Sequence, residues 1–126
     1  MLTKTAKIFL LSGAIAGAFT IIIGAFGAHS ASNILNSNTM AMFETGVKYQ
    51  GLHSLALLFT GLIMKQNIVT FKFSGWFFII GIFGFSGGLY IFSMSSYSWI
   101  HVFIPLGGTA FLLGWIFLAI GIFQLK

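Results

Sequence analysis

Four long runs of apolar residues are the feature that most constrains how this chain folds. They cover residues 8–28, 45–64, 73–94 and 102–123, and Lys48 is the only lysine or acidic residue inside them. A helix needs about 20 mainly apolar residues to cross a membrane. Membrane β-strands instead alternate polar and apolar residues, and the runs show no such alternation. The runs therefore predict four transmembrane helices.

The composition favours the same fold class. Of the 126 residues, 58% are hydrophobic and only 6% are charged, whereas a soluble domain carries about 25% charged residues. A short chain has a large surface relative to its core, so these few charges could not cover it in water. We therefore expect an all-α membrane protein, with one four-helix domain over residues 1–126 and lipid over most of its surface.

The connections and the lysines predict the topology. The connections at residues 65–72 and 95–100 are short, which makes neighbouring helices antiparallel and gives an up-down-up-down bundle. One end of this bundle carries five of the six lysines, namely Lys4, Lys7, Lys65, Lys72 and Lys126. Lysine-rich ends stay in the cytoplasm. We predict a multi-pass protein of the plasma membrane with the N-terminus and the C-terminus inside.

The first run has an alternative interpretation as a cleaved signal peptide, because Lys4 and Lys7 precede an apolar stretch that ends in small residues. Its length of about 21 residues exceeds the 7–15 residues usual for such peptides, so we favour a retained helix. Residues 29–43, rich in Ser and Asn, predict the longest loop. Asn38 or Thr39 is the expected N-cap of the helix that follows.

The charge balance bears on partners. The formal net charge is +5 and Glu44 is the single acidic residue, a balance that could indicate nucleic-acid binding. The lysines flank apolar runs, however, which is typical of anchors for acidic lipid headgroups. We expect the lipid bilayer as partner and no nucleic acid. The chain has no cysteine, which excludes disulfides and thiolate chemistry.

Glycines recur at helical spacing, which is typical of close helix contacts in membranes. In the first run a small-residue face opposes a face of bulky residues, Ile8, Leu11, Ile15, Ile22 and Phe26. The predicted packing glycines are Gly13, Gly17, Gly24, Gly27, Gly81, Gly84, Gly88, Gly107, Gly114 and Gly121. A pore lining is the alternative, but such faces normally also carry polar groups. Surplus small faces predict a homo-oligomer.

A second set of candidates is polar and lies at membrane depth. His53 is eight residues inside its run, or about 12 Å at 1.5 Å per residue. Counting to the same depth in the other runs reaches Thr20, Ser86 and the neighbourhood of Thr109. We predict one polar layer of His53, Tyr49, Gln50, Thr20 and Ser86, because ionisable groups at this depth are costly and mark function.

Two roles are open for this layer. In the structural role, a neutral His53 bonds to a hydroxyl and holds the helices in register. In the alternative, the imidazole titrates near neutral pH and relays protons or gates a solute. On the helical wheel the polar side chains share a face with Gly46 and Thr60, opposite Leu52, Leu55, Phe59 and Leu62. We expect that polar face to point into the bundle.

A third group is expected at the outer surface. Glu44 and Lys48 are spaced i, i+4, which suits an ion pair, and His29 and His101 should end nearby. Imidazoles with a carboxylate can bind a metal, but these residues come from three separate elements without motif spacing, so we predict no metal. The aromatic residues near the run ends, Trp76, Tyr90, Tyr97 and Trp99, are expected at headgroup level.

Several segments resemble one known family. They are Gly24-Ala-Phe-Gly-Ala-His29, Phe43-Glu-Thr-Gly-Val-Lys-Tyr-Gln50 followed by His53, Phe85-Ser-Gly-Gly-Leu-Tyr90, and Pro105-Leu-Gly-Gly108 with Gly114-Trp115. The pattern is similar to that of domain-of-unknown-function family 423 over nearly the whole chain. The resemblance implies a four-span membrane protein and brings no established activity, substrate or cofactor.

The remaining signals do not indicate chemistry. No nucleophile has a base beside it, and no phosphate-binding loop follows a strand. We therefore expect neither an enzyme nor a cofactor. The leading hypothesis is a structural protein that stabilises the membrane or organises a partner membrane-protein complex. The alternative is a small transporter or channel subunit that uses His53.

Overall fold

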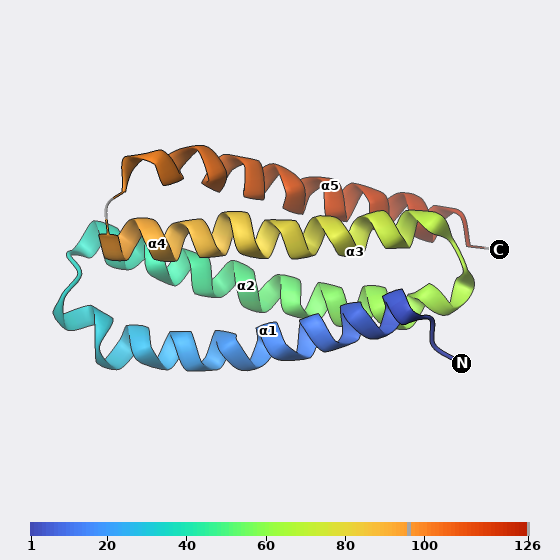
Figure 1. Cartoon of the computed structure of the whole chain (residues 1–126), viewed down its shortest axis with the longest axis horizontal. Helices are drawn as coiled ribbons and strands as arrows, with labels where there is room; N and C mark the ends of the chain where they lie inside the picture. Colours follow the sequence, from blue (N-terminus) through green and yellow to red (C-terminus); the bar gives the residue numbers. More distant parts are fainter. Residues whose placement is uncertain (96, 126) are drawn as a thin grey trace.

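The computed structural model describes residues 1–95 and 97–125, and all regular elements in this part of the chain are helical. The long helices are α1 (Lys4–His29), α2 (Ser37–Ile63), α3 (Val69–Gly81), α4 (Gly87–Ser95) and α5 (Phe103–Phe123). α3 and α4 form one continuous run through a π-helical segment at Ile82–Ser86. Both termini lie at the same end of the bundle (Figure 1). The predicted all-helical class is confirmed.

Three helical segments are long and apolar enough to cross a membrane. They are Lys4–Asn33, Val69–Ser95 and Ser98–Phe123. α2 is not among them, although it has 27 residues. The reason lies in its sequence, because Glu44, Lys48, Gln50 and His53 lower its average hydropathy. The sequence prediction of four spans is therefore supported by length and composition for three of them.

The ends of the elements differ in detail from the prediction. Asn36, rather than Asn38 or Thr39, caps α2, and its side-chain Oδ1 accepts a hydrogen bond of 2.9 Å from the Thr39 backbone N–H. The backbone of Asn36 is extended while Ser37 is already helical, which is the geometry of an N-cap. The connection from α2 to α3 contains a 3₁₀ turn at Met64–Gln66, and another 3₁₀ turn at Ser98–Val102 leads into α5.

The most extensive contacts join α1 to α2 and α3 to α5. In the first pair, a Cβ on Gly13 would lie 2.8 Å from the carbonyl oxygen of Ser54, and one on Gly61 would lie 2.8 Å from the Leu10 side chain. Gly17 and Gly24 are looser, since their nearest neighbours would be 3.5 Å and 3.4 Å away. The bulky residues predicted to oppose this contact, from Ile8 to Phe26, are exposed.

In the second pair, aromatic rings pack directly on glycines. Phe111 covers Gly81, Phe78 covers Gly114 and Phe71 covers Gly121, each too closely for any side chain to replace the glycine hydrogen. Where the π-helical segment passes α5, a Cβ on Gly84 would lie 3.1 Å from the Cα of Gly107. The remaining predicted glycines also face a neighbouring helix, with Gly27 against Phe43 and Gly88 against Ile104.

The π-helical segment is a departure from the expected regular helix over residues 73–94. It begins after Gly81 and contains Gly84, the residue at the close backbone contact with α5. Single π-helical turns occur mostly inside α-helices and often at functional sites. Here the segment forms part of the wall of a cleft, described below.

Candidate functional site

His53 is almost completely buried, with 1% of its surface exposed. Its Nδ1 lies 2.7 Å from the carbonyl oxygen of Tyr49, and the indole N–H of Trp115 donates to its Nε2 at 3.0 Å. A carbonyl only accepts and an indole N–H only donates. The imidazole is therefore neutral, with its hydrogen on Nδ1. The predicted hydroxyl partner is wrong, because the partner is an indole.

Aromatic rings surround this imidazole. The ring of Phe111 stacks on it with 3.5 Å between centroids and 8° between planes, and Phe78 lies 5.5 Å away. Tyr49 and Trp115 complete the set at 6.1 Å and 6.0 Å. We call these five residues the aromatic cluster. It joins α2 to α3 and α5.

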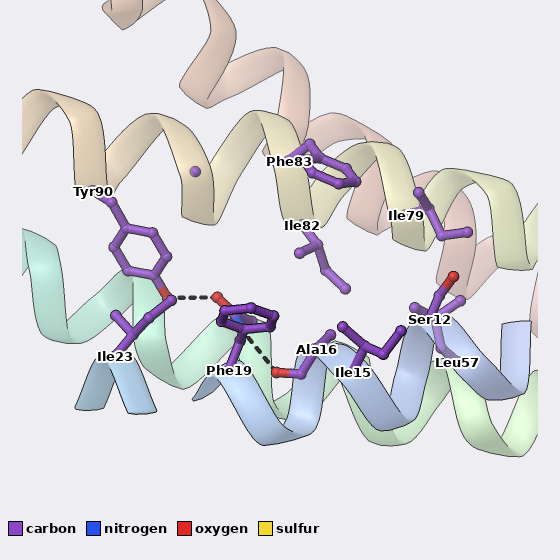
Figure 2. Close-up of a pocket in the computed structure, with 12 residues that line it drawn as sticks. Ser12, Ile15, Ala16, Phe19, Ile23, Leu57, Ile79, Ile82, Phe83 and Tyr90 are labelled. Carbon is purple, nitrogen blue, oxygen red and sulfur yellow. Dashed lines mark hydrogen bonds between the residues drawn. The ribbon is translucent and has the colours of Figure 1, made fainter. Parts of the chain in front are cut away.

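Gln50 makes a second set of contacts toward other helices. Its amide nitrogen donates to the carbonyl oxygen of Ala16 on α1 at 2.9 Å. Its amide oxygen accepts a hydrogen bond of 2.8 Å from the Tyr90 hydroxyl on α4. Figure 2 shows this chain of two bonds, which we call the polar bridge. Tyr90 therefore lies inside the bundle rather than at headgroup level as predicted.

The other members of the predicted layer do not bond to His53. Thr20 donates to the carbonyl oxygen of Ala16 in its own helix at 2.8 Å, and this oxygen is also the acceptor of Gln50. Thr109 is exposed and bonds to Pro105 of its own helix at 2.9 Å. Ser86 is buried, and its hydroxyl has no hydrogen-bond partner among the residues that the structure describes. The layer is thus replaced by two groups, the aromatic cluster and the polar bridge, which connect α2 to different helices.

Most of the predicted inward face of α2 is buried as expected. Gly46, Gln50, His53 and Thr60 are buried, whereas the leucines and Phe59 on the opposite face are exposed. Tyr49 is the exception, with 39% of its surface exposed. The helical wheel therefore predicts which face of α2 points into the bundle. It does not predict the hydrogen-bond partners of the polar side chains on that face.

Trp115 and Tyr90 belong to these two groups although neither was predicted to do so from the sequence. The signal was present for Trp115, because it lies inside an apolar run and an indole N–H at that depth needs an acceptor. His53 is the natural acceptor, since a neutral imidazole offers one nitrogen lone pair. The sequence gives no comparable signal for Tyr90. It lies five residues before the end of α4, a position that is also compatible with the headgroup region.

The predicted outer group is more dispersed. His29, Glu44, Lys48 and His101 are all exposed, and the expected ion pair between Glu44 and Lys48 is not formed in the described part of the chain. Both residues instead line a hollow of about 250 Å³. His101 packs on Phe92 with 4.1 Å between ring centroids. Within residues 1–95 and 97–125, no three His, Asp or Glu side chains lie close enough to hold a metal ion.

A larger cleft of about 390 Å³ lies between α1, α2 and the run formed by α3, the π-helical segment and α4. Its walls are mainly apolar, with Phe19 of α1 on one side and Ile82 and Phe83 of the π-helical segment on the other (Figure 2). Tyr90 lies toward one end of the cleft (Figure 2), and the polar bridge runs from its hydroxyl through Gln50 to the carbonyl oxygen of Ala16. The site thus combines tight helix contacts with an apolar cleft.

Comparison with known proteins gives one consistent result. Residues 23–108 match the family model described as "Protein of unknown function (DUF423)". A UPF0382 membrane protein of Staphylococcus saprophyticus is 35% identical over 119 residues, which are 94% of this chain and 99% of the relative. One of Haemophilus influenzae is 38% identical over 120 residues, 94% and 95% of the two chains.

The UPF0382 inner membrane protein YgdD of Escherichia coli is 35% identical over 123 residues, 97% of this chain and 94% of YgdD. No solved structure matches. The matched region contains Gln50, His53 and Tyr90, whereas Trp115 lies beyond residue 108. These relatives are membrane proteins by name, and their alignments cover nearly the whole of this chain.

Proposed function

We propose that this chain, which belongs to the DUF423 family of membrane proteins of unknown function, is a non-enzymatic structural protein of the plasma membrane. The observation that carries the proposal is the bonding of the buried imidazole and amide. Both nitrogens of His53 have partners, and Gln50 bonds to α1 and α4 at once. These groups hold helices together and leave no exposed reactive centre among them.

We further propose that α2 is the fourth span of an up-down-up-down bundle. Its 27 residues give a length of about 40 Å at 1.5 Å per residue, which is sufficient to cross the membrane. Leu52, Leu55 and Leu62 are exposed, so the face that would meet lipid is apolar. The lysines at the end that holds the termini favour a cytoplasmic location for both.

The introduction of single cysteines tests this topology, because the natural chain has none. We expect cysteines at Asn67 and at Asn33 to react with a membrane-impermeant maleimide from opposite sides, Asn67 from the cytoplasm. Both positions are exposed and lie in connections at opposite ends of α2. Labelling of both cysteines from the same side would contradict a spanning α2.

The role of such a protein is to stabilise the membrane or to organise a complex within it, with a second copy or another membrane protein as partner. The alternative is a transporter or channel subunit in which His53 exchanges protons or gates a solute. That mechanism needs the imidazole to change partners. A proton added at Nε2 would face the Trp115 N–H, which is also a donor, so the observed bonding favours the structural role.

Flux measurements discriminate between the two. The purified protein is reconstituted into liposomes, and proton and potassium flux is compared for the parent, His53→Leu and the exposed control Thr109→Val. We expect no flux above that of empty liposomes for any of them, together with a lower unfolding midpoint for His53→Leu only. Parent flux that disappears in His53→Leu and persists in Thr109→Val would overturn the structural role.

A further inference from the structure

The hollow lined by Glu44 and Lys48, of about 250 Å³, lies between α1 and α2. The connection between these two helices is at the end of the bundle opposite the termini (Figure 1). The α1 wall of the hollow is formed by Gly24, Gly27 and Ala28, none of which has a side chain larger than a methyl group. From α2, Glu44 contributes a carboxylate and Lys48 an ammonium group. The hollow therefore presents both signs of charge to a ligand.

The depth of the two charges follows from the contacts between α1 and α2. A Cβ on Gly24 would lie 3.4 Å from the Val47 side chain, so Lys48, the next residue of α2, is level with the residue before Gly24. The apolar run of α1, residues 8–28, is about 30 Å long, which is also the thickness of the hydrocarbon core. The Cα of Lys48 would thus lie about 8 Å inside the outer edge of this core, and that of Glu44, one turn nearer the start of α2, about 2 Å inside.

Charges at this depth need partners, because ionisable side chains within spanning helices usually pair with one another. Glu44 and Lys48 are exposed and form no ion pair within the described residues. Side chains of a helix lean toward its N-terminus, which for α2 is the outer end. Extended in that direction, the four-carbon stem of Lys48, about 6 Å long, brings its ammonium group to about 2 Å inside the edge. The Glu44 carboxylate leans outward from a Cα at that depth, so the negative group lies outside the positive one.

This order of charges complements the headgroup of phosphatidylethanolamine. In this lipid the phosphate is joined to the glycerol, close to the acyl chains, and the ammonium group lies further out. A lipid of the outer leaflet would place its phosphate against the Lys48 ammonium and its own ammonium against the Glu44 carboxylate, both as charge-assisted hydrogen bonds. Further along the same face of α2, Leu52 and Leu55 are exposed and offer apolar surface to the acyl chains. We propose that the hollow binds the headgroup of one phosphatidylethanolamine molecule, a proposal that rests on the spanning α2 proposed above.

The assay is native mass spectrometry of the full chain in a mild non-ionic detergent. Phosphatidylethanolamine, phosphatidylcholine and phosphatidylglycerol with identical acyl chains are added in equal amounts. The choline group has no N–H to donate to Glu44, and the glycerol headgroup has no ammonium, so we expect one phosphatidylethanolamine to be retained in preference to both. Equal retention of the three lipids would overturn the proposal, as would a second protein copy bound in place of lipid. Displacement of the lipid by glycerophosphoethanolamine, which has no acyl chains, would indicate a soluble ligand and would also overturn it.

The order of the charges is tested by exchanging them. Glu44→Lys combined with Lys48→Glu keeps the formal charge at +5, and both positions are exposed, so this variant should fold. We expect its preference for phosphatidylethanolamine over phosphatidylcholine to fall about 10-fold, which corresponds to about 1.4 kcal/mol. The control Lys65→Gln, in the connection from α2 to α3, should leave the preference unchanged although it lowers the net charge. An unchanged preference in the exchanged variant would overturn the site, and so would an equal loss in both, which indicates diffuse attraction.

Ala28 offers a way to fill the hollow without changing any charge. It lines the hollow and is exposed, so Ala28→Leu should fold and occupy the space. Ala25→Leu is the matched control, because Ala25 is also exposed on α1 but lies outside the hollow lining. We expect Ala28→Leu to lose the lipid while keeping its thermal stability, and Ala25→Leu to retain it. Retention of the lipid by a folded Ala28→Leu protein would contradict binding in the hollow.

The lipid assay is separate from the tests of the proposed function. Flux through the parent would contradict the structural role without changing the mass of the lipid adduct. Labelling of the cysteines at Asn33 and Asn67 from the same side would contradict the spanning α2 and with it the depth of the two charges. Labelling from opposite sides, together with no preference for phosphatidylethanolamine, would contradict the lipid site alone.

Discussion

The hydrogen bond between Trp115 and His53 gives the most quantitative prediction. Within the described residues, Trp115 is the one side-chain donor to Nε2. Trp115→Phe removes it and leaves that nitrogen unsatisfied in a residue that is 1% exposed. An unmade bond at a buried polar group costs about 1–3 kcal/mol. Hydrogen bonds between helices within membranes contribute about 0.6 kcal/mol on average and at most about 1.7 kcal/mol.

We expect a coupling energy near the upper end of that range, about 1–1.7 kcal/mol. The reason is that no other donor replaces the indole, because the rings of Phe78 and Phe111 occupy the remaining sides of the imidazole. His53→Leu removes both hydrogen bonds of the imidazole but keeps an apolar side chain. The double variant should therefore be more stable than the sum of the two single losses predicts.

The measurement is a double-mutant cycle by reversible unfolding in mixtures of a mild detergent and sodium dodecyl sulfate, followed by far-ultraviolet circular dichroism. Thr109→Val combined with Trp115→Phe serves as the control pair, since Thr109 bonds only within its own helix. The control should be additive within about 0.3–0.5 kcal/mol. Equal additivity for His53→Leu with Trp115→Phe would refute the proposed role of this bond.

Two further predictions concern the glycine contact of α5 and the polar bridge. Gly107→Leu should abolish folding, because its side chain would overlap the backbone of Gly84 and Phe85. The control Gly108→Leu has room for a Cβ and should fold. Similar unfolding midpoints for the two variants would contradict this close contact. Gln50→Leu leaves the Tyr90 hydroxyl without its acceptor and should cost about 1–3 kcal/mol, with Tyr90→Phe as a milder comparison; a Gln50→Leu protein as stable as the parent would argue against the bridge.

The sequence predicts the helices and their contact faces well because both depend on local spacing. A glycine that faces a neighbouring helix must recur with the helical period, and Gly107, Gly114 and Gly121 do so over two intervals of seven residues. Each of them is buried against α3 or the segment that follows it. The orientation of α2 follows from the same periodicity.

The partners of the polar groups could not be obtained from depth alone. Counting residues to equal depth selected Thr20 and Thr109, but it says nothing about the direction in which a side chain points. Hydroxyl groups in helices often bond to the carbonyl four residues earlier, and both threonines do so. The partner of His53 lies 62 residues away, and no local pattern encodes such a pairing.

The two kinds of contact act at different levels of the architecture. Glycines bring α1 against α2 and α3 against α5, the two most extensive contacts in the bundle. The polar bridge and the aromatic cluster then connect α2 to α4, α3 and α5. Loss of a tight glycine should therefore disrupt a helix pair, because backbones cannot move apart without losing many contacts. Loss of His53 should instead loosen one pair against the other while each pair stays intact, and loss of Gln50 should do the same while also removing one hydrogen bond between α1 and α2.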